Sequence, residues 1–378
     1  MTFDPSISIG VLGGGQLGRM MIQSAMDLNL EISCIDPDPN APCKNLASHF
    51  VNGDITNYDE VLAFGDPCDV ITVEIENVNV EALEELERRG KKVFPQPSVL
   101  RTIKDKGLQK QFYLDHDIPT SEFVFIHQKE DLQDYTDMLP AANKLRTDGY
   151  DGRGVQIIKT AEQLDKGFEA PSILEKFVDY QKEISVIVAR NENGDMTTFP
   201  VVELEYHPEQ NLVEFLFSPS EIDLDIRNRA RELAETVISK FDMVGLLAVE
   251  MFVTKDGNLM VNECAPRTHN SGHHTIEGNI TSQFEQHIRA ILNLPLGDTD
   301  TKGSAVMINL LGHPDHTGLA KYEGIDQAMG IKGMHVHLYG KKHTKPYRKM
   351  GHVTLVGKDL QTLKQTARKL KESIKIIA

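Results

Sequence analysis

Cysteine is scarce in this sequence. The chain of 378 residues contains only four, at positions 34, 43, 68 and 264, and no two of them form a CxxC pair. The first residues, MTFDPSISIG, lack the basic segment followed by an apolar one that marks a secretory signal. No apolar run approaches the ~18 residues of a membrane-spanning helix. We therefore expect a cytoplasmic protein with reduced thiols and no membrane partner.

Basic residues are also in deficit. Lys and Arg number 40 against 56 Asp and Glu, which gives a formal net charge of −16. This charge argues against a general nucleic-acid binder. The composition is otherwise that of a globular protein, with 40% hydrophobic and 25% charged residues. The length exceeds that of one ordinary hydrophobic core, so we expect two or three domains.

The most informative stretch runs from Leu246 to His274. Two apolar runs, 246–253 and 259–261, flank Asp256-Gly257, which predicts a two-residue hairpin turn. On that register Glu250 lies directly opposite Glu263, with their Cβ atoms roughly 5 Å apart. Two carboxylates this close repel each other unless a cation lies between them. The pair predicts a Mg²⁺ site, with Mn²⁺ as a substitute; the alternative is a solvated face on which the two charges only repel.

A glycine turn follows the first predicted strand. Residues 7–12 have the pattern of a buried strand, Gly13, Gly15 and Gly18 fit GxGxxG, and apolar residues then recur at helical spacing. Asp36 ends the next strand at about the distance of the ribose-binding acid in dinucleotide-binding proteins. Taken alone, this pattern predicts an NAD-dependent dehydrogenase. A helix N-terminus can equally hold another phosphate or a carboxylate, and such a turn can also serve only to pack helix on strand.

Other segments are predicted from their periodicity. A strand at 70–75 ends in Glu74 and Glu76, beside the glycine turn if the sheet is parallel. Residues 98–114 predict one helix with a cationic side formed by Arg101, Lys104, Lys106 and Lys110. The remaining predicted strands are 122–126, 155–158, 173–178, 183–190, 197–203 and 306–311, and the remaining predicted helices are 81–89, 223–241 and 281–292.

Two segments are suited to binding anions. Residues 143–158 place glycines at 149, 152 and 154 between two strands, with Lys144 and Arg153 beside them, which predicts a lid over phosphates. The alternative is an ordinary flexible hairpin. Near the C-terminus, the segment 341–349 gathers five basic residues. It either binds an anionic substrate or is solvated surface.

Several chemistries can be weighed against these segments. His335 and His337 share a strand face but have no third and fourth ligand at zinc-site spacing. No GxSxG motif supports covalent catalysis. A dehydrogenase would use only the first forty or so residues, whereas phosphoryl transfer would use the acidic pair, the lid and the basic segment. A non-enzymatic nucleotide sensor would not need the polar run 267–271 beside the acidic pair.

These segments together resemble the ATP-grasp ligases, and among them the 5-(carboxyamino)imidazole ribonucleotide synthases. The matching segments are GGGQLGRM (13–20), TVEIENV (72–78), DGYDGRG (148–154), ILEKFV (173–178), VEMFV (249–253), VNECAPRTHNSGHHT (261–275), SQFEQHIRAILNLPLG (282–297) and YRKMGH (347–352). The resemblance implies a mixed α/β (α+β) ATP-grasp fold. Its expected parts are a Rossmann-like N-terminal domain at 1–103, a lid domain at 104–190 and a larger mixed C-terminal domain at 191–378.

The resemblance also implies a reaction. ATP, bicarbonate and 5-aminoimidazole ribonucleotide would yield the carbamate of the exocyclic amine, ADP and phosphate, as a step of purine (IMP) biosynthesis. The amine would capture either carboxyphosphate or the CO₂ released from it. The expected assembly is a homodimer. Formate-using ATP-grasp transformylases and biotin carboxylases are the nearest alternatives.

Site residues follow from the same resemblance. ATP is expected at Lys106, Lys144, Gly149, Tyr150, Asp151, Gly152, Arg153, Gly154, Val155, Glu175, Lys176, Phe177, Val178, Glu183, Asn262 and Glu263. Mg²⁺ is expected at Glu250 and Glu263, and the ribonucleotide at Gln16, Leu17, Glu76, Lys341 and Arg348. Asp151, Arg153, His269 and Asn270 are expected near carboxyphosphate. Two departures affect the pattern: Ala265 stands where many ATP-grasp enzymes have Asn, and 203–207 differs from the usual Glu-Asn-x-His, so His207 is assigned no role.

Overall fold

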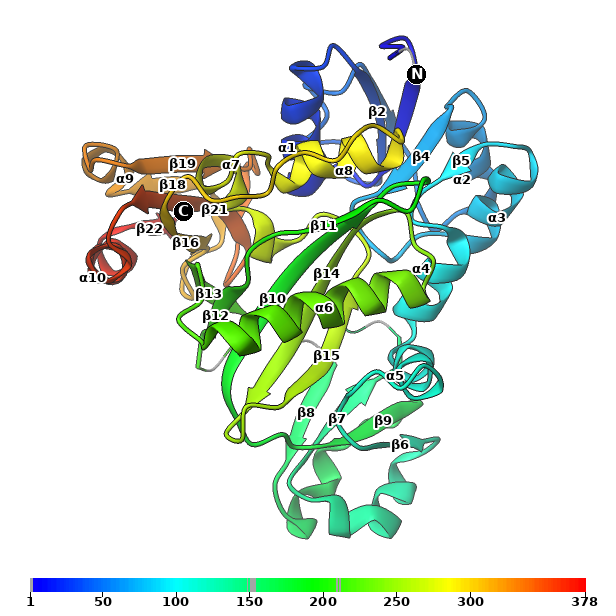
Figure 1. The fold of residues 1–378 in the computed structure, drawn as a ribbon, viewed down its shortest axis with the longest axis vertical. Helices are drawn as coiled ribbons and strands as arrows, with labels where there is room; N and C mark the ends of the chain where they lie inside the picture. The colour runs from blue at the N-terminus through cyan, green and yellow to red at the C-terminus, as the bar shows by residue number, and fades with distance from the viewer. Residues whose placement is uncertain (1–2, 148, 150–153, 209, 211) are drawn as a thin grey trace.

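The computed structural model describes residues 3–147, 149, 154–208, 210 and 212–378. Figure 1 shows an N-terminal part in blue and cyan, a lid in teal at the opposite end, and a large central part between them. The C-terminal segments, in orange and red, extend to one side of this central part (Figure 1). Within the described residues, no helix has the length and apolar character needed to cross a membrane.

The N-terminal part is a five-stranded parallel sheet with the order β3-β2-β1-β4-β5. Helix α1 packs on one face, and helices α2 and α3 contribute to the core on the other. Its elements are β1 (Ser8–Leu12), α1 (Gln16–Met26), β2 (Glu31–Asp36), β3 (His49–Asn52), α2 (Tyr58–Gly65), β4 (Val70–Val73), α3 (Val80–Arg88) and β5 (Lys92–Val93). The predicted strand–glycine turn–helix unit is therefore confirmed.

The single helix expected at 98–114 is wrong. The segment forms α4 (Pro97–Lys104) and α5 (Lys106–Asp115), separated by Asp105 in an extended conformation. The Asp105 carboxylate accepts hydrogen bonds from the N–H groups of Gly107 at 2.8 Å and Leu108 at 3.2 Å, so it caps the second helix. It also pairs with Arg146 at 2.5 Å. The break therefore starts α5 at Lys106, next to the site described below.

The lid is a four-stranded antiparallel sheet with the order β6-β9-β7-β8. Its elements are β6 (Phe123–Ile126), the 3₁₀ segment η1 (Lys129–Met138), β7 (Ala141–Leu145), β8 (Val155–Ile158), η2 (Ala161–Lys166) and β9 (Ser172–Lys176). The next strand, β10 (Tyr180–Arg190), belongs to the central sheet. The expected lid boundary at residue 190 therefore does not fit this sheet, and we propose a boundary between Lys176 and Tyr180.

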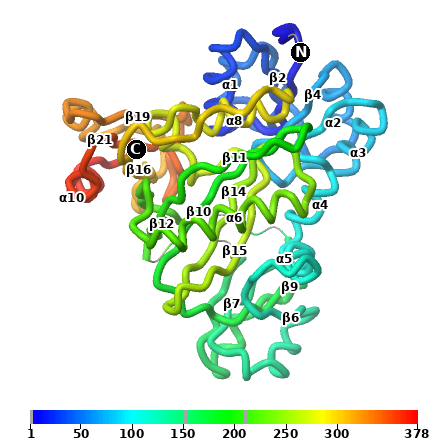
Figure 2. Tube along the Cα trace, viewed as in Figure 1, coloured from blue at the N-terminus to red at the C-terminus, as the bar shows by residue number. Residues whose placement is uncertain are grey.

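Within the described part of the chain, the central sheet has nine strands, in the order β15-β14-β10-β12-β13-β16-β21-β19 with β11 paired to β10. Its strands are β10, β11 (Met196–Thr198), β12 (Val202–Tyr206), β13 (Val213–Ser218), β14 (Gly245–Thr254), β15 (Leu259–Ala265), β16 (Ser304–Leu311), β19 (Met334–Leu338) and β21 (Lys349–Gly357). Figure 2 shows β10 and β14 running side by side through the middle of the molecule, as their pairing requires. The strand expected at 197–203 is in fact β11 and β12, which are separate strands.

The other elements complete the central part. They are α6 (Leu224–Lys240), η3 (Asn270–Gly272), α7 (Thr275–Gly278), α8 (Gln283–Ile291), β17 (Gly318–Leu319), β18 (Lys321–Glu323), α9 (Ile325–Ala328), β20 (His343–Thr344), α10 (Leu360–Ser373) and β22 (Lys375–Ile377). Helix α6 packs against β10, β14 and β15, whose buried residues form one core with it. Phe284 and Ile288 of α8 pack in the core of α1, which joins the N-terminal sheet to the central part.

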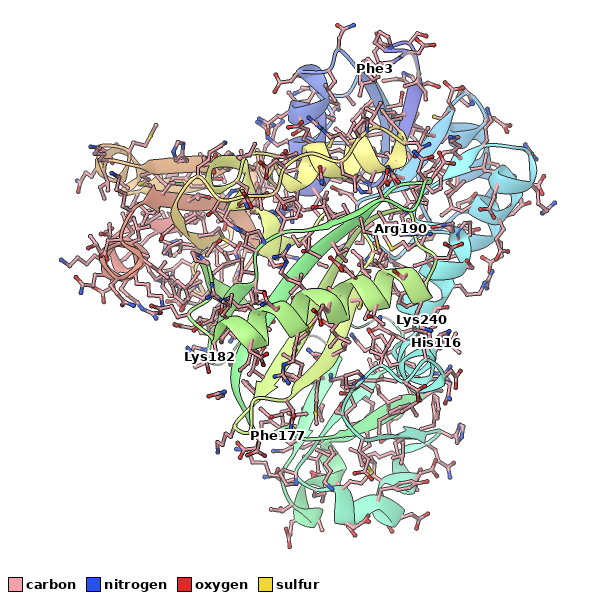
Figure 3. All side chains as sticks on the ribbon, viewed as in Figure 1. Phe3, His116, Phe177, Lys182, Arg190 and Lys240 are labelled. Carbon is pink, nitrogen blue, oxygen red and sulfur yellow. The ribbon has the colours of Figure 1, made fainter. Side chains whose placement is uncertain are left out.

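Strand β10 connects the ends of the molecule. In Figure 3, Phe177 is labelled beside the lid and Arg190 is labelled near the N-terminal part, at the opposite end of the strand. The lid, the acidic hairpin β14–β15 and the N-terminal sheet therefore border one region, in which the predicted site residues can meet.

Candidate active site

Glu250 on β14 and Glu263 on β15 lie directly opposite each other, as predicted. The connecting turn, however, is not the predicted two-residue turn. The N–H of Thr254 donates to the carbonyl of Asn258 at 2.9 Å, so the loop contains three residues. Gly257 occupies it with φ of +76°, a conformation that favours glycine.

A bulge at Asn262 compensates for the longer turn. Met251 pairs with Val261, but the next pair is Glu250 with Glu263, so Asn262 is an extra residue in β15. Without the bulge, Glu250 would face Asn262 instead of Glu263. Two deviations from a regular hairpin thus restore the pairing that the simple register predicted.

The pKa values of the two carboxyl groups are shifted in opposite directions. Burial, and then the charges of Glu263 and Glu183, raise the pKa of Glu250. Lys106, the first residue of α5, forms an ion pair with Glu263 and holds its pKa well below the usual range. Lys106 itself keeps its charge despite burial, because Glu263 raises its pKa. The arrangement suits a divalent cation, because carboxylate oxygens are the ligands Mg²⁺ prefers and a dication would relieve the repulsion.

Tyr206 and His269 border the same pair. The Tyr206 hydroxyl donates to Glu250 Oε2 at 3.2 Å, and His269 Nε2 lies 3.8 Å from Glu250 Oε1. Burial raises the pKa of Glu183 on β10, and Tyr180 and Tyr206 partly offset this rise. Glu183, Glu250, Glu263 and Tyr206 therefore form one partly buried acidic cluster beside the hairpin.

Lys144 lies on the lid side of this cluster. From β7, its ammonium donates to Glu175 Oε2 at 3.2 Å and to Asn262 Oδ1 at 3.1 Å. The bulge thus places Asn262 against the lid lysine, while the adjacent Glu263 pairs with Lys106. Two lysines beside two facing carboxylates can bind polyphosphate oxygens while the carboxylates bind a metal ion.

The glycine turn of the N-terminal sheet is occupied by side chains of the protein itself. Gly15 and Gly18 donate their N–H groups to the buried carboxylate of Glu74, the latter at 2.6 Å. Gly14 donates to Asp36 at 2.7 Å. A dinucleotide pyrophosphate needs these N–H donors, and Asp36 would be its ribose ligand. The turn is therefore not built as a dinucleotide site.

A second set of predicted residues lies near this turn. Glu76 forms an ion pair with Arg267, with Arg267 Nε 2.9 Å from its Oε1, and its charge also acts on Lys106. Burial raises the pKa of Glu74, and Lys341 is among the charges that oppose this rise, which places Lys341 near the turn. The Lys341 ammonium donates to the carbonyl of Lys349 at 2.8 Å.

Comparison with known proteins identifies the family. Three family models match the chain: a ribonucleotide synthetase preATP-grasp domain over residues 7–104, an ATP-grasp domain over 111–284, and a phosphoribosylaminoimidazole carboxylase C-terminal domain over 305–366. The N5-carboxyaminoimidazole ribonucleotide synthase of Bacillus subtilis is 36% identical over 359 residues, which cover 93% of this chain and 92% of that protein. The chain belongs to the N5-carboxyaminoimidazole ribonucleotide synthase family of ATP-grasp ligases. The family and fold predicted from the sequence are confirmed.

Solved structures of this synthase family agree with the fold. The crystal structure of the Thermotoga maritima synthetase has a TM-score of 0.90 at 38% identity and matches 98% of this chain and 99% of that one. The Aspergillus clavatus synthase, solved in complex with ADP and 5-aminoimidazole ribonucleotide, has a TM-score of 0.89 at 32% identity, with 97% and 98% covered. Some curated relatives are longer: the phosphoribosylaminoimidazole carboxylase of Vigna aconitifolia is 39% identical, but the chain spans only 65% of its length.

The structure brings most of the predicted site residues to this region, with some exceptions. Tyr150, Asp151, Gly152 and Arg153 lie outside the described residues, whereas Gly154, at φ of +78°, and Val155 at the start of β8 lie beside Lys144 on β7. The side chain of Asn270 accepts a hydrogen bond from Asn309 at 2.8 Å. Lys176 points to Glu122 on the lid surface, and Arg348 donates to the carbonyl of His343 within its own loop.

Sequence reasoning missed three residues of this region. Arg267 was noted only as part of a polar run, and its partner Glu76 is 191 positions away in the chain. Tyr206 belongs to the segment whose altered motif led us to assign no role. Glu74 was noted at a strand end, but its hydrogen bonds to the glycine turn depend on the packing of β4 beside β1.

Proposed function

We propose that this chain catalyses the ATP- and bicarbonate-dependent carboxylation of 5-aminoimidazole ribonucleotide to N5-carboxyaminoimidazole ribonucleotide, a step of purine biosynthesis. The observation that carries the proposal is the facing pair Glu250 and Glu263 with Lys106 and Lys144 beside it, in a chain of this synthase family. Metal-bound polyphosphate between cations is the arrangement that phosphoryl transfer requires.

Glu250 and Glu263 hold Mg²⁺, or Mn²⁺ in its place. When bound, the ion neutralises charge on the ATP phosphates. Lys106 and Lys144 bind phosphate oxygens, and Lys106 exchanges its present partner Glu263 for them. The loop 149–155 covers the phosphates, and the backbone of 175–178 with Glu183 holds the nucleoside. Asn262 orients Lys144 through their 3.1 Å hydrogen bond.

The reaction has two bond-forming steps. A bicarbonate oxygen attacks the γ-phosphorus of ATP, which forms carboxyphosphate and releases ADP. The exocyclic amine then attacks the carboxyl carbon, or the CO₂ released from carboxyphosphate, to give the carbamate and inorganic phosphate. His269 and Asn270, together with Asp151 and Arg153 of the lid loop, lie around carboxyphosphate.

The ribonucleotide binds toward the N-terminal sheet. Its phosphate contacts the first turn of α1 at Gln16 and Leu17, together with Lys341 and Arg348, and Glu76 is near the imidazole. In support, Glu74 accepts hydrogen bonds from the N–H groups of Gly15 and Gly18, and the charge of Lys341 acts on Glu74.

The same proposal covers organisation and location. The functional parts are the N-terminal domain at 1–103, the lid, and the larger C-terminal domain, and the enzyme is a cytoplasmic homodimer. Its four cysteines are buried and unpaired, in accord with a reducing compartment. Size-exclusion chromatography with light scattering measures the assembly.

One experiment tests the activity. Purified protein with Mg²⁺-ATP is assayed for ADP release with and without 5-aminoimidazole ribonucleotide and bicarbonate, and ¹³C-bicarbonate is followed into the carbamate by NMR. We expect ADP release and carbamate formation to require both co-substrates. Stimulation by formate instead of bicarbonate would indicate a transformylase, and the absence of any ribonucleotide-dependent turnover would contradict the proposal.

A further inference from the structure

Lys110 on α5 is a lysine that the proposed ATP contacts do not use. The sequence predicted it on a cationic helix face, but it is 2% exposed. Its ammonium donates to Thr120 Oγ1 at 2.6 Å and to Ser121 Oγ at 2.9 Å. Burial lowers its pKa to about 8, although Glu175 opposes this change. A buried ammonium is costly unless it is paired, so its partners indicate its role.

The main partner of Lys110 is Glu175 on β9, which is only 4% exposed. Glu175 lies 3.1 Å from the Lys110 ammonium and 3.2 Å from the Lys144 ammonium. It also accepts a hydrogen bond from Ser121 at 2.9 Å. Burial alone would raise the pKa of Glu175, but Lys144 and Lys110 overcome this and lower it to about 2. One ionised carboxylate is therefore shared by two lysines.

Thr120 extends this network to the acidic hairpin. Its hydroxyl, which accepts from Lys110, donates to the carbonyl of Val261 at 2.7 Å. The N–H of Val261 donates to the carbonyl of Pro119 at 2.7 Å. The next residue, Asn262, accepts from Lys144. Lys144 therefore has two acceptors that are connected to Lys110. Glu175 contacts Lys110 directly, and Asn262 is connected to it through Thr120 and the neighbouring Val261.

We propose that Lys110 is a positioning residue for ATP, because it neutralises Glu175 and so leaves the charge of Lys144 available to the nucleotide phosphates. The inference rests on the proposed function, in which Lys144 contacts ATP. Two ammonium groups and one carboxylate leave the cluster with a net positive charge. Without Lys110, the carboxylate would neutralise Lys144 and hold it away from the phosphates.

A double-mutant cycle tests this role. The variants are Lys110→Met, Glu175→Gln and the double variant, with Lys104→Met as a control. Lys104 is a partly buried lysine of the neighbouring helix whose ammonium donates to the carbonyl of Val78 at 3.1 Å. The measurements are the KM for ATP, the KM for the ribonucleotide, and the Kd of Mg²⁺-ADP by calorimetry.

If Lys110 acts through Glu175, Lys110→Met should raise the KM for ATP about tenfold, the loss expected for one weakened charge-assisted contact. The KM for the ribonucleotide should stay within about twofold, as should all constants of Lys104→Met. In the Glu175→Gln background the same Lys110 substitution should change the KM for ATP by less than about twofold, because there is no charge left to neutralise.

Other outcomes overturn the proposal. An unchanged KM for ATP in a folded Lys110→Met variant would do so. An equal rise in the KM for ATP in the wild-type and Glu175→Gln backgrounds would do so as well. If Lys110→Met alone does not fold, Glu175→Gln is compared with the double variant, because neither contains the unpaired carboxylate. A difference of more than about twofold in the KM for ATP between these two variants overturns the proposal. If wild-type protein shows no ribonucleotide-dependent turnover, the proposed function fails, whereas the Mg²⁺-ADP binding cycle still reports on Lys110.

Discussion

Glu250 should make the metal-free protein less stable as the pH rises through neutrality. Burial, followed by the charges of Glu263 and Glu183, raises its pKa to about 8, whereas a glutamate in an unfolded chain has a pKa of about 4.3. The folded protein therefore holds a proton that the unfolded chain releases. The stability from this proton is complete below the unfolded pKa and is lost as the pH rises through the folded pKa. The expected loss is about 1 kcal/mol between pH 7 and 8 and about 2 kcal/mol between pH 6.5 and 8.5.

Lys110 also titrates in this window, because burial lowers its pKa to about 8, but its contribution is the same in wild type and in a Glu250 variant. The pKa of Glu263 is lowered to about 2, chiefly by Lys106, so its contribution is lost only in acid. Burial lowers the pKa of His274 to about 3 and of His287 to about 4. Their stabilising contribution is present above about pH 6.5 and is lost only as the pH falls. Between pH 7 and 8, the difference in stability between wild type and Glu250→Gln therefore isolates Glu250.

The measurement is urea unfolding in EDTA at pH 7.0, 7.5 and 8.0. Wild type is compared with Glu250→Gln, which cannot titrate, and with Glu232→Gln on the exposed face of α6 as a control. The stability of wild type relative to Glu250→Gln should fall by about 1 kcal/mol over this range, and relative to the control it should not change. With excess Mg²⁺ the trend should reverse, because the bound ion requires both carboxylates deprotonated. If the difference in the free energy of unfolding between wild type and Glu250→Gln does not change with pH, the reasoning is refuted.

Three further predictions follow from the site. Glu263→Gln should abolish Mg²⁺-dependent turnover with an unchanged circular dichroism spectrum, because a neutral amide cannot balance a dication; near-normal rates at low Mg²⁺ would exclude this metal ligand. NAD and NADP should not bind in calorimetry, because Glu74 already accepts from the N–H groups of the glycine turn; micromolar affinity for either would contradict this. Lys341→Ala and Arg348→Ala should each raise the KM for the ribonucleotide about ten- to a hundredfold and spare ATP, since each removes a charge-assisted phosphate contact worth roughly 1.5–3 kcal/mol; a change within about twofold in both variants would show that the loop is surface.

The β14–β15 hairpin shows what a local sequence pattern can predict and what it cannot. Facing of Glu250 and Glu263 was predicted from an assumed two-residue turn, and the facing is confirmed. The turn has three residues, and the bulge at Asn262 restores the register. The alternation of apolar residues could place each glutamate on a face, because side chains alternate along a strand. Turn length and bulge depend on contacts such as that of Asn262 with Lys144, which the hairpin sequence does not contain.

The helices show the same difference between features that local sequence predicts and features that depend on tertiary packing. The start of α1 after the glycine turn was predictable, because glycine spacing and apolar periodicity are local signals. The break at Asp105 was missed, although Asp is a common N-cap, because the apolar period continues across it. Lys110 was predicted on the cationic side of a single helix, and its burial was not foreseen, since lysine is normally exposed. Its burial follows from the packing of β9 and residues 119–121 over α5.

The sequence by itself determined the class of this protein: motif order and composition were enough to predict an ATP-grasp ligase, and the family comparison agrees. Those signals are local, since each motif needs only its own turn, strand or helix. Only the tertiary structure decided which charges meet, as in Glu76 with Arg267, Glu74 with the glycine turn and Lys110 with Glu175. These pairs join residues 56 to 191 positions apart. Their strength depends on distance and burial, which are properties of the packed chain and not of any one segment.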